Sequence, residues 1–371
     1  MMPNATKNGL FIGLMSGTSL DGIDCVICDI NPAGIELKHS LLVDWPADLK
    51  LELQQIIDQS DSLDQMLVAD QRCAAVYASA CNKILQNNDI QPDSIIAIGS
   101  HGQTIRHNPD SDFGYSCQIG SGSRIAELTG ITTITDFRNR DIAAHGQGAP
   151  LAPAFHQAVF PADEKNRAVV NIGGIANVTL INGEGISGYD TGPGNRLLDD
   201  WIHHCHGKSY DKDGNFAASG LVNQELLKNL LSDAYFQKTA PKSTGSDYFN
   251  LDWLKQRLKP FESLKEADIQ ATLAELTAAS IANEVTKQTK QYEEVLICGG
   301  GWHNKDLLNR LKSYLPNSEI ASSGKYGIDP DWMEAMAFAW LGWRTINGFS
   351  GNLPEVTGAI GLRICGAIYP A

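Results

Sequence analysis

The sequence predicts an α/β protein of two lobes, and three observations lead to this prediction. Apolar strand-like runs alternate with helical stretches along the chain. The opening pattern, a glycine-rich turn between two apolar runs, recurs after residue 167. A chain of 371 residues also exceeds the size at which one hydrophobic core usually splits. We expect a first lobe over residues 1–140, with the tail 355–371 as a candidate addition, and a second lobe over residues 141–354.

The first lobe begins with strands and continues with helices. Its first two apolar runs, separated by a short turn, predict a hairpin. Within residues 64–86, apolar side chains recur at steps of three and four, which is typical of one face of a helix. The expected elements are strands at 10–15, 25–30, 35–43, 95–99 and 131–135, and helices between about 48 and 86.

The second lobe follows a stretch rich in proline and glycine, residues 143–153, which predicts a connection between the lobes. Residues 183–188 match G-x-G-x-x-G formally, but no helix follows them, so we interpret them as a turn and not as a dinucleotide site. The expected elements are strands at 168–172, 178–181 and 295–298, and helices at about 269–290, 307–311 and 332–346.

Composition excludes several classes of function. The 29 basic and 43 acidic residues give a net charge of −14, which argues against a nucleic-acid partner. No apolar run approaches the length of a membrane span, and the run at 10–15 is too short for a signal peptide. We therefore expect a cytoplasmic protein without a membrane partner.

Two clusters have the spacing of metal ligands, and neither is convincing. Cys25 and Cys28 are three residues apart in an expected strand, so their side chains point to opposite faces. His203 and His206 would share a face of a helix, but no second ligand cluster is evident, and we interpret them as a polar helix end. The eight scattered cysteines indicate reduced, mostly buried thiols.

The turn after the first strand has the chemistry of a phosphate site. Glycines let the backbone approach a ligand and point its N–H groups at anionic oxygens. Ser16, Thr18 and Ser19 add hydroxyl donors. The alternative is a tight structural hairpin. No G-x-x-x-x-G-K-[ST] motif occurs, so the chain has no P-loop.

Eight motifs occur in the order found in the anhydro-N-acetylmuramic acid kinase family, which the chain resembles over essentially its whole length. The resemblance implies a two-lobed actin-like ATPase (ribonuclease H-like) fold with ATP in the interlobe cleft. The motifs are Met15–Asp24, Ser100–Thr104, Asp136–Asp141, Gly146–Pro150, Asn171–Asn177, Tyr189–Asn195, Ile297–Asn304 and Glu334–Trp340.

The resemblance also implies an activity. The family uses ATP and water to open the ring of 1,6-anhydro-N-acetylmuramic acid, giving N-acetylmuramic acid 6-phosphate and ADP in peptidoglycan recycling. It implies a homodimer and Mg²⁺ as well. The alternative is an ordinary sugar or acid kinase of the same superfamily, in which Asp190 would deprotonate a substrate hydroxyl.

Site residues follow from the matched motifs. Asp190, in a loop rich in glycine and proline, would be the base that activates water, although such an aspartate can also bind its own backbone. The glycines 299–301 would serve the nucleotide or begin the following helix. The expected ATP-binding residues are Gly17, Thr18, Ser19, Leu20, Asp21, Gly22, Ile23, Asp24, Gly173, Gly174, Asn177, Gly299, Gly300 and Gly301.

Contacts to the sugar and to the metal are less determined by the sequence. His101, Gln103, Arg138 and Glu334 offer hydrogen bonds to an amide, hydroxyls and a carboxylate, for which arginine is the natural partner. Arg138 and Arg140 could equally form structural ion pairs. Leu14 stands where the superfamily usually has an acidic residue near magnesium, so the metal ligands stay open among Asp21, Asp24 and Asp190.

Overall fold

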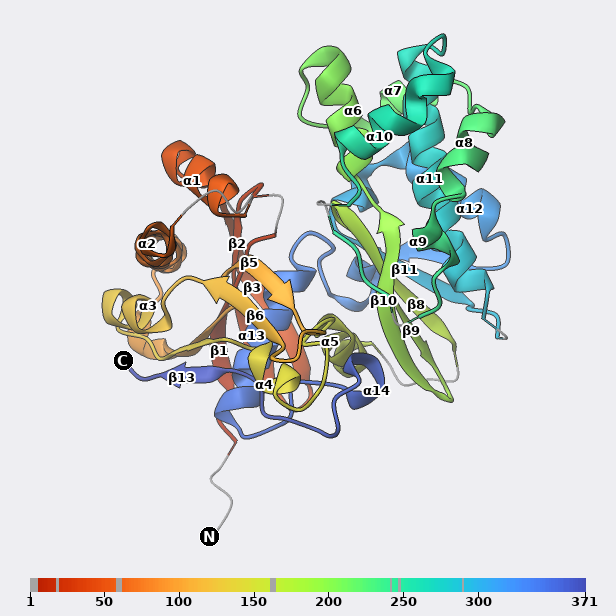
Figure 1. Ribbon diagram of the computed structural model, residues 1–371. Helices are drawn as coiled ribbons and strands as arrows, with labels where there is room; N and C mark the ends of the chain where they lie inside the picture. Colours follow the sequence, from red (N-terminus) through yellow and green to blue (C-terminus); the bar gives the residue numbers. More distant parts are fainter. Residues whose placement is uncertain are drawn as a thin grey trace. The chain divides into compact units, whose positions relative to one another are not determined.

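The computed structural model describes residues 6–17, 20–57, 62–160, 165–240, 242–245, 248–288 and 290–371. Its contacts divide the chain into two units. Unit 1 comprises Met1–Phe160 and Trp332–Ala371, and unit 2 comprises Pro161–Asp331. Each unit contains a mixed β-sheet with packed helices (Figure 1). The predicted α/β class with two lobes is therefore confirmed.

The sheet of unit 1 has the order β13-β7-β4-β1-β2-β3. Its first three strands form an antiparallel meander, while β4 and β7 run parallel to β1. The last strand, β13, returns from the C-terminus and pairs antiparallel with β7. The strands are β1 (Gly9–Met15), β2 (Ile23–Asn31), β3 (Gly34–Val43), β4 (Ile95–Ser100), β7 (Thr133–Thr135) and β13 (Ala367–Tyr369).

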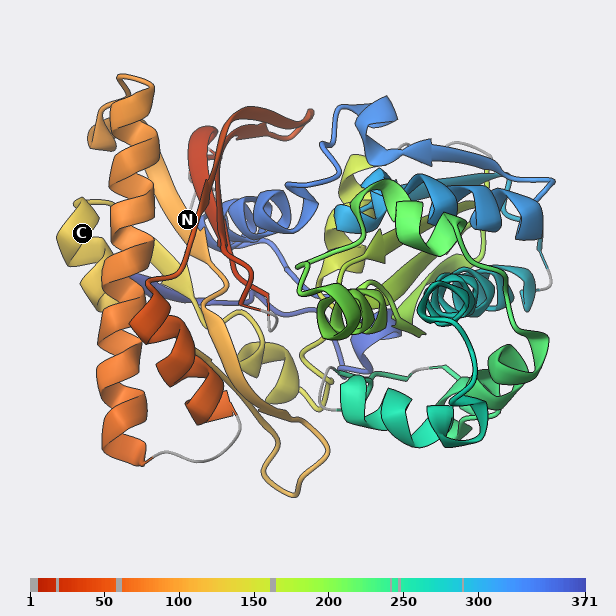
Figure 2. The same cartoon turned by 90° about the horizontal axis from the view of Figure 1, so that it is seen from above.

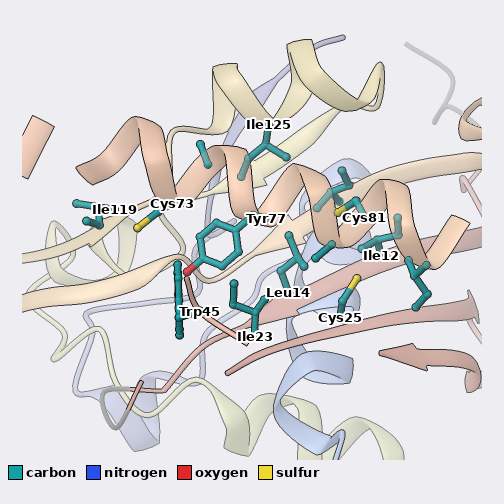
Figure 3. Close-up of a cluster of buried hydrophobic side chains, with 14 of the residues drawn as sticks. Ile12, Leu14, Ile23, Cys25, Trp45, Cys73, Tyr77, Cys81, Ile119 and Ile125 are labelled. Carbon is teal, nitrogen blue, oxygen red and sulfur yellow. The ribbon is translucent and has the colours of Figure 1, made fainter. Parts of the chain in front are cut away.

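Helices cover both faces of this sheet (Figure 1 and Figure 2). On one face lie α1 (Ala47–Ile57) and α2 (Leu63–Asn87), and Figure 3 shows Tyr77 of α2 beside Trp45, in the buried cluster that also contains Leu14 and Ile23 of the sheet. On the other face, α13 (Met333–Ile346) packs against β1, β2 and β4. Because side chains alternate along β1, they pack against a helical layer on each face of the sheet.

Smaller elements of unit 1 follow β4 in the sequence, up to residue 159, and one more lies in the C-terminal segment. The sequence did not predict the two-stranded sheet of β5 and β6. The first two residues of β5 lie in the motif Ser100–Thr104, which was interpreted as the end of the preceding strand. These elements are β5 (Gln103–Asn108), β6 (Tyr115–Ile119), α3 (Gly122–Thr129), α4 (Asn139–Ile142), α5 (Ala152–Val159) and α14 (Pro354–Thr357).

The sheet of unit 2 repeats the plan of the first, in the order β10-β9-β8-β11-β12. Its first three strands are an antiparallel meander, and β11 and β12 extend it in parallel from β8. The recurrence of the opening pattern is confirmed. The strands are β8 (Arg167–Ile172), β9 (Ile175–Asn182), β10 (Gly185–Pro193), β11 (Glu294–Cys298) and β12 (Glu319–Ser322).

Two apolar clusters hold unit 2 together. One joins the sheet to α11 and α12, and the other joins α11 to α6, α8 and α10. Both surround α11, which explains why its apolar side chains lie all round the helix and not along one stripe. The helices are α6 (Arg196–His206), α7 (Asn215–Ala218), α8 (Gln224–Leu231), α9 (Ala234–Gln237), α10 (Leu251–Leu258), α11 (Glu266–Thr286) and α12 (Lys305–Tyr314).

The units divide at residues 160/161 and 331/332, and not at the expected 140/141 and 354/355. The stretch 143–153 stays with unit 1 because its backbone pairs with the C-terminal segment: Gln147 N–H donates to Thr357 O and Ile360 N–H to Ala144 O. Helix α13 stays there because it packs on β1 and β4.

The expected turn at residues 183–188 is wrong in part. Gly183 and Glu184 form a turn, but Gly185 to Gly188 belong to β10 and pair with β9. Ladder hydrogen bonds to a neighbouring strand outweigh the turn preference of isolated glycines here.

The cysteines form no disulfide bond within the described residues, as expected, and most are buried. Cys25 joins the apolar cluster beneath α2 and Cys28 does not, so the two thiols lie on opposite faces of β2. No helix among the described residues has the length and apolar character needed to cross a membrane.

Candidate active site

The turn between β1 and β2 is held by a hydrogen bond to α2 and by one within the turn. The Ser16 hydroxyl forms a hydrogen bond of 2.7 Å with the Tyr77 hydroxyl on α2. Leu20, buried and in the left-handed region at φ 57°, donates its N–H to Gly17 O at 3.2 Å. Thr18 and Ser19, two of the expected ATP contacts, lie outside the described residues.

The remaining residues of this turn differ in their exposure. Asp21 is exposed, Gly22 and Asp24 are half-buried, and Ile23 belongs to the core. Asp24 is already in β2, opposite Met15 in the ladder. Asp21 is thus the carboxylate of this turn that solvent reaches most readily.

His101, just after β4, is held in one tautomer. Its Nδ1–H donates to Gly102 O at 2.8 Å, since a carbonyl can only accept. Its Nε2 therefore accepts from Arg138, whose Nη2 lies 2.9 Å away and whose Nε lies 3.2 Å away. Burial, followed by the charge of Arg138, lowers the pKa of His101 well below its usual 6.5, so the ring is neutral at pH 7.

Arg138 is fixed from a second side and stays charged. Its Nη1 donates to Gly148 O at 2.9 Å. Burial lowers the pKa of Arg138 to about 10, and the carboxylate of Glu334, exposed at the start of α13, acts in the opposite direction. With its Nε side turned to His101, Arg138 has only its Nη1/Nη2 edge for a bidentate contact. Arg140 is exposed.

Gln103 links the His101 segment to the first turn. Its Nε2 donates to Gly17 O at 3.3 Å. The side chain is fully buried, and its Oε1 has no hydrogen-bond partner within the part of the chain that the structure describes. Unit 1 therefore brings four of the expected site residues into two hydrogen-bonded pairs, Gln103 with Gly17 and Arg138 with His101. The charge of Glu334 acts on Arg138.

In unit 2, Asp190 lies in strand β10 and not in the loop that the sequence predicted. It pairs with Asn177 of β9, and the ladder then bulges before Gly192. Its N–H donates to Lys242 O at 3.2 Å, and Thr244 N–H donates to its Oδ2 at 3.0 Å. The carboxylate is thus bound by a distant segment, and not by its own turn.

The Asp190 carboxyl group holds its proton more tightly than an ordinary aspartic acid does. Burial raises the pKa of Asp190 from 3.8 to about 6, against the Thr244 N–H and the positive charge of Lys242, which lower it. Lys242 is itself buried and paired with Glu284 of α11 at 2.9 Å. The pKa near 6 suits a base that works at neutral pH.

The glycine turn between β8 and β9 is joined to the end of β10. Asn195 N–H donates to Gly173 O at 2.8 Å, and Gly194 N–H donates to Gly174 O at 2.9 Å. A Cβ on Gly194 would lie 2.3 Å from Gly173 O, so only glycine allows this approach. The structure therefore brings together the segments that carry Asp190 and the expected second phosphate turn.

A row of polar residues crosses the same end of this sheet. Asn171 of β8 pairs with Asn177 of β9, which pairs with Asp190 of β10. Directly paired residues share a face of a sheet. Their neighbours Val170, Val178 and Tyr189 belong to the core on the opposite face.

The glycines after β11 border this row. Gly299 has φ 76°, and a Cβ there would lie 2.3 Å from Asn171 Oδ1. The next helix, α12, is capped by Asn304, which accepts the Leu307 N–H at 3.0 Å. Gly300 and Gly301 begin a 3₁₀ helix, Gly300–His303, that comes before α12, in agreement with the alternative of a helix start. Nucleotide binding stays a prediction for these glycines.

A metal site is not preformed in the described residues. They contain no group of three or more His, Cys, Asp or Glu side chains that could hold an ion. His203 and His206 end α6 as exposed side chains, in agreement with a polar helix end.

The structure adds residues that the sequence analysis did not select. Lys242 and Thr244 bind Asp190 from 52 and 54 residues away in sequence, and only a shared family motif could have indicated them. Gly148 could have been selected from the sequence, because it lies in the matched motif Gly146–Pro150.

Comparisons with known proteins agree with the resemblance. A family model described as anhydro-N-acetylmuramic acid kinase matches residues 9–371. A protein of that name from Xylella fastidiosa (strain Temecula1) is 49% identical over 99% of this chain and 98% of its own. One from Pseudomonas fluorescens (strain Pf0-1) is 47% identical over 97% and 99%. Among solved structures, an activator of 2-hydroxyisocaproyl-CoA dehydratase from Clostridium difficile with bound ADPNP covers 90% of this chain and 94% of its own, with 11% identity and a TM-score of 0.46.

Proposed function

Because the chain belongs to the anhydro-N-acetylmuramic acid kinase family, we propose that it uses ATP and water to open the ring of 1,6-anhydro-N-acetylmuramic acid. The products are N-acetylmuramic acid 6-phosphate and ADP, and the reaction serves peptidoglycan recycling. The chain is a kinase of this family, with the two-lobed actin-like ATPase fold that the family implies. The observation that carries the proposed chemistry is the Asp190 carboxylate, which has a pKa near 6.

The substrate dictates a coupled reaction. Its O6 bridges to the anomeric carbon, so there is no 6-hydroxyl to phosphorylate. Water forms a bond to the anomeric carbon, the bond from that carbon to O6 breaks, and O6 forms a bond to the γ-phosphorus as ADP leaves. Phosphoryl capture replaces the general acid that usually protonates a departing sugar oxygen.

Asp190 is proposed as the base that takes the proton from water. At pH 7 a carboxyl with a pKa of about 6 is mostly ionised yet retains appreciable basicity. Thr244 N–H engages Oδ2, and we assign proton transfer to Oδ1. Because Lys242 O accepts the Asp190 N–H, the backbone of the base is fixed as well.

The proposed ATP contacts come from both units. Unit 1 supplies the turn 17–24, and unit 2 supplies Gly173, Gly174, Asn177 and the glycines 299–301. Magnesium would neutralise charge on the phosphates. Because the described residues offer no three-ligand cluster, the ion would be held by phosphates and water, with Asp21 or Asp24 as the carboxylate, since Asp190 is assigned to the attacking water.

The proposed sugar contacts lie in unit 1. The Nη1/Nη2 edge of Arg138 would bind the lactyl carboxylate, and Glu334 would accept from a hydroxyl or the amide N–H. His101 acts as a fixed neutral partner of Arg138, since its Nε2 lone pair is already used. Gln103 Oε1 has no hydrogen-bond partner within the described chain, and it would accept a hydrogen bond from the sugar or from the first turn.

Two further proposals rest on the family alone. We propose a homodimer, which gel filtration with light scattering would test. We also propose a cytoplasmic location, where ATP is available.

Oxygen-18 water tests the proposed reaction. With ATP and the anhydro sugar, label should appear at the anomeric oxygen of the product and be absent from its phosphate. A control with unlabelled product in labelled water corrects for exchange during ring opening. An ordinary sugar kinase would instead phosphorylate free N-acetylmuramic acid without incorporating label, and that result would overturn the proposal.

A further inference from the structure

Asp141, in α4, is a fully buried carboxylate that the proposed chemistry does not use. Its Oδ1 accepts from Asn352 Nδ2 at 2.6 Å and from Thr357 Oγ1 at 2.8 Å. Its Oδ2 accepts from the N–H of Gly148 at 2.8 Å. Buried carboxylates with several donors form strong, directional bonds, so Asp141 fixes the positions of all three partners.

Gly148 connects Asp141 to the proposed sugar site. Its N–H is bound by Asp141, and its carbonyl accepts from Arg138 Nη1 at 2.9 Å. Arg138 in turn donates to His101 Nε2. One peptide segment therefore lies between the buried carboxylate and the guanidinium that we assign to the substrate carboxylate.

Two glycines make this close packing feasible. A Cβ on Gly146 would lie 2.2 Å from Asp141 Oδ2. Gly148 has φ 66°, and a Cβ there would lie 2.8 Å from Ile142 Cγ1 and 3.1 Å from Arg138 O. Larger residues at either position would push the segment away from Asp141 or Arg138.

The C-terminal segment completes the arrangement. Besides its hydroxyl bond to Asp141, Thr357 accepts the N–H of Gln147 through its carbonyl at 2.8 Å. Ile360 N–H donates to Ala144 O at 2.9 Å. The segment 352–360, more than 200 residues from Asp141 in sequence, thus holds the stretch 144–148 in place through hydrogen bonds.

We propose that Asp141 is a positioning residue for sugar recognition, acting through Gly148 on Arg138 and His101, and that Thr357 of the C-terminal segment holds it in place. The inference rests on the proposed sugar-binding role of Arg138. A purely structural role would change stability and affect both substrates alike. A positioning role affects the anhydro sugar and leaves ATP unaffected.

The test compares two isosteric or near-isosteric variants at Thr357. Thr357→Val keeps the shape and removes the hydroxyl, whereas Thr357→Ser keeps the hydroxyl. We expect Thr357→Val to raise the KM for the anhydro sugar roughly 3- to 10-fold, the effect of one hydrogen bond, with the KM for ATP within about twofold. Thr357→Ser should restore the sugar KM. Asp141→Asn should have a larger effect of the same kind.

Controls separate this inference from the proposed function. Asp211→Asn in unit 2 removes a buried carboxylate that accepts from two backbone N–H groups, and it should leave the sugar KM unchanged. Arg138→Met tests the sugar site itself. If Arg138→Met leaves the sugar KM unchanged, the assignment of Arg138 fails.

If Arg138→Met raises the sugar KM while Thr357→Val does not, the inference about Asp141 is overturned and the site stands. Equal changes in both KM values, or a Thr357→Ser variant that behaves like Thr357→Val, would also overturn it. Thermal melts of every variant identify loss of folding, and the Thr357 pair decides the question if Asp141→Asn does not fold.

Discussion

At the scale of single residues, Asp190 combines a buried environment with donors that partly stabilise its charge. Replacing it with asparagine keeps the shape and removes the base. We expect Asp190→Asn to lower kcat by about 10²- to 10⁴-fold, the usual contribution of a positioned general base. ATP affinity should change little, because no phosphate contact is assigned to this side chain. Calorimetric titration of the variant with ATP supplies the comparison, and a large loss of nucleotide affinity would contradict the assigned role.

The pKa of Asp190 also sets a pH dependence. The base acts when ionised, so kcat/KM should rise about tenfold per pH unit below the pKa of about 6 and level off above it. Lys242 lowers this pKa through its positive charge, so Lys242→Met should move the acid limb to higher pH.

Lys287 provides the matched control for this prediction. Its Nζ also pairs with Glu284 Oε1 at 2.9 Å, but its side chain is exposed, and the lysine charge that acts on Asp190 is that of Lys242. Lys287→Met should therefore leave the acid limb in place. Rate profiles from pH 5 to 9 test both variants, and equal displacement of the limb by the two would count against a direct effect of Lys242.

At the scale of elements, α13 links the core of unit 1 to the sugar site. It crosses β1 and β4 at two glycines, where a Cβ on Gly13 would lie 2.0 Å from Ala335 O and one on Gly99 would lie 2.0 Å from Phe338 O. The same helix carries Glu334 and places the Phe338 ring 4.7 Å from that of His101. The contact of helix and sheet therefore positions site residues too.

A single methyl group should disturb this contact. In Gly13→Ala the new atom meets backbone, so the helix must move, and we expect a loss of about 3 kcal/mol in the free energy of unfolding. Gly183→Ala is the control, since open space surrounds that position. Urea denaturation compares them. If the two variants are equally stable, the packing argument is wrong.

The elements show what the sequence could predict. Apolar runs correctly predicted β1 to β4, β7, β8, β9 and β11, and the period of three to four predicted α2. The strands β5, β6, β10, β12 and β13 were not predicted. The pairing of Gly185–Gly188 in β10 was missed, since glycines give no strand signal and only β9 holds them there. The bonds from Asp190 N–H to Lys242 O and from the Thr357 hydroxyl to Asp141 depend on tertiary contacts between distant segments, which no local pattern contains.

At the scale of the whole molecule, one plan occurs twice. Each unit begins with an antiparallel meander and adds strands parallel to its first one. In both units the turn after the first strand contains glycine and is hydrogen-bonded to a segment that carries a proposed site residue. Gly17 O accepts from Gln103 in unit 1, and Gly173 O accepts from Asn195, five residues after Asp190, in unit 2. The recurrence was readable from sequence because the hairpin and its glycine turn are local. The roles of the two turns could be assigned only through the family.

The thiols give a prediction for the whole chain. Six of the eight cysteines are buried, and only Cys117 and Cys205 are partly exposed. Burial raises the pKa of Cys205 to about 11 and raises that of Cys117 as well, so few thiolates exist at pH 8. Ellman's reagent should therefore modify at most two thiols of the native protein, slowly, and all eight after unfolding in guanidinium chloride. In a Cys117→Ser, Cys205→Ser double variant the native reaction should nearly vanish. Rapid modification of a third thiol would show that the core of one unit opens far more readily than its packing indicates.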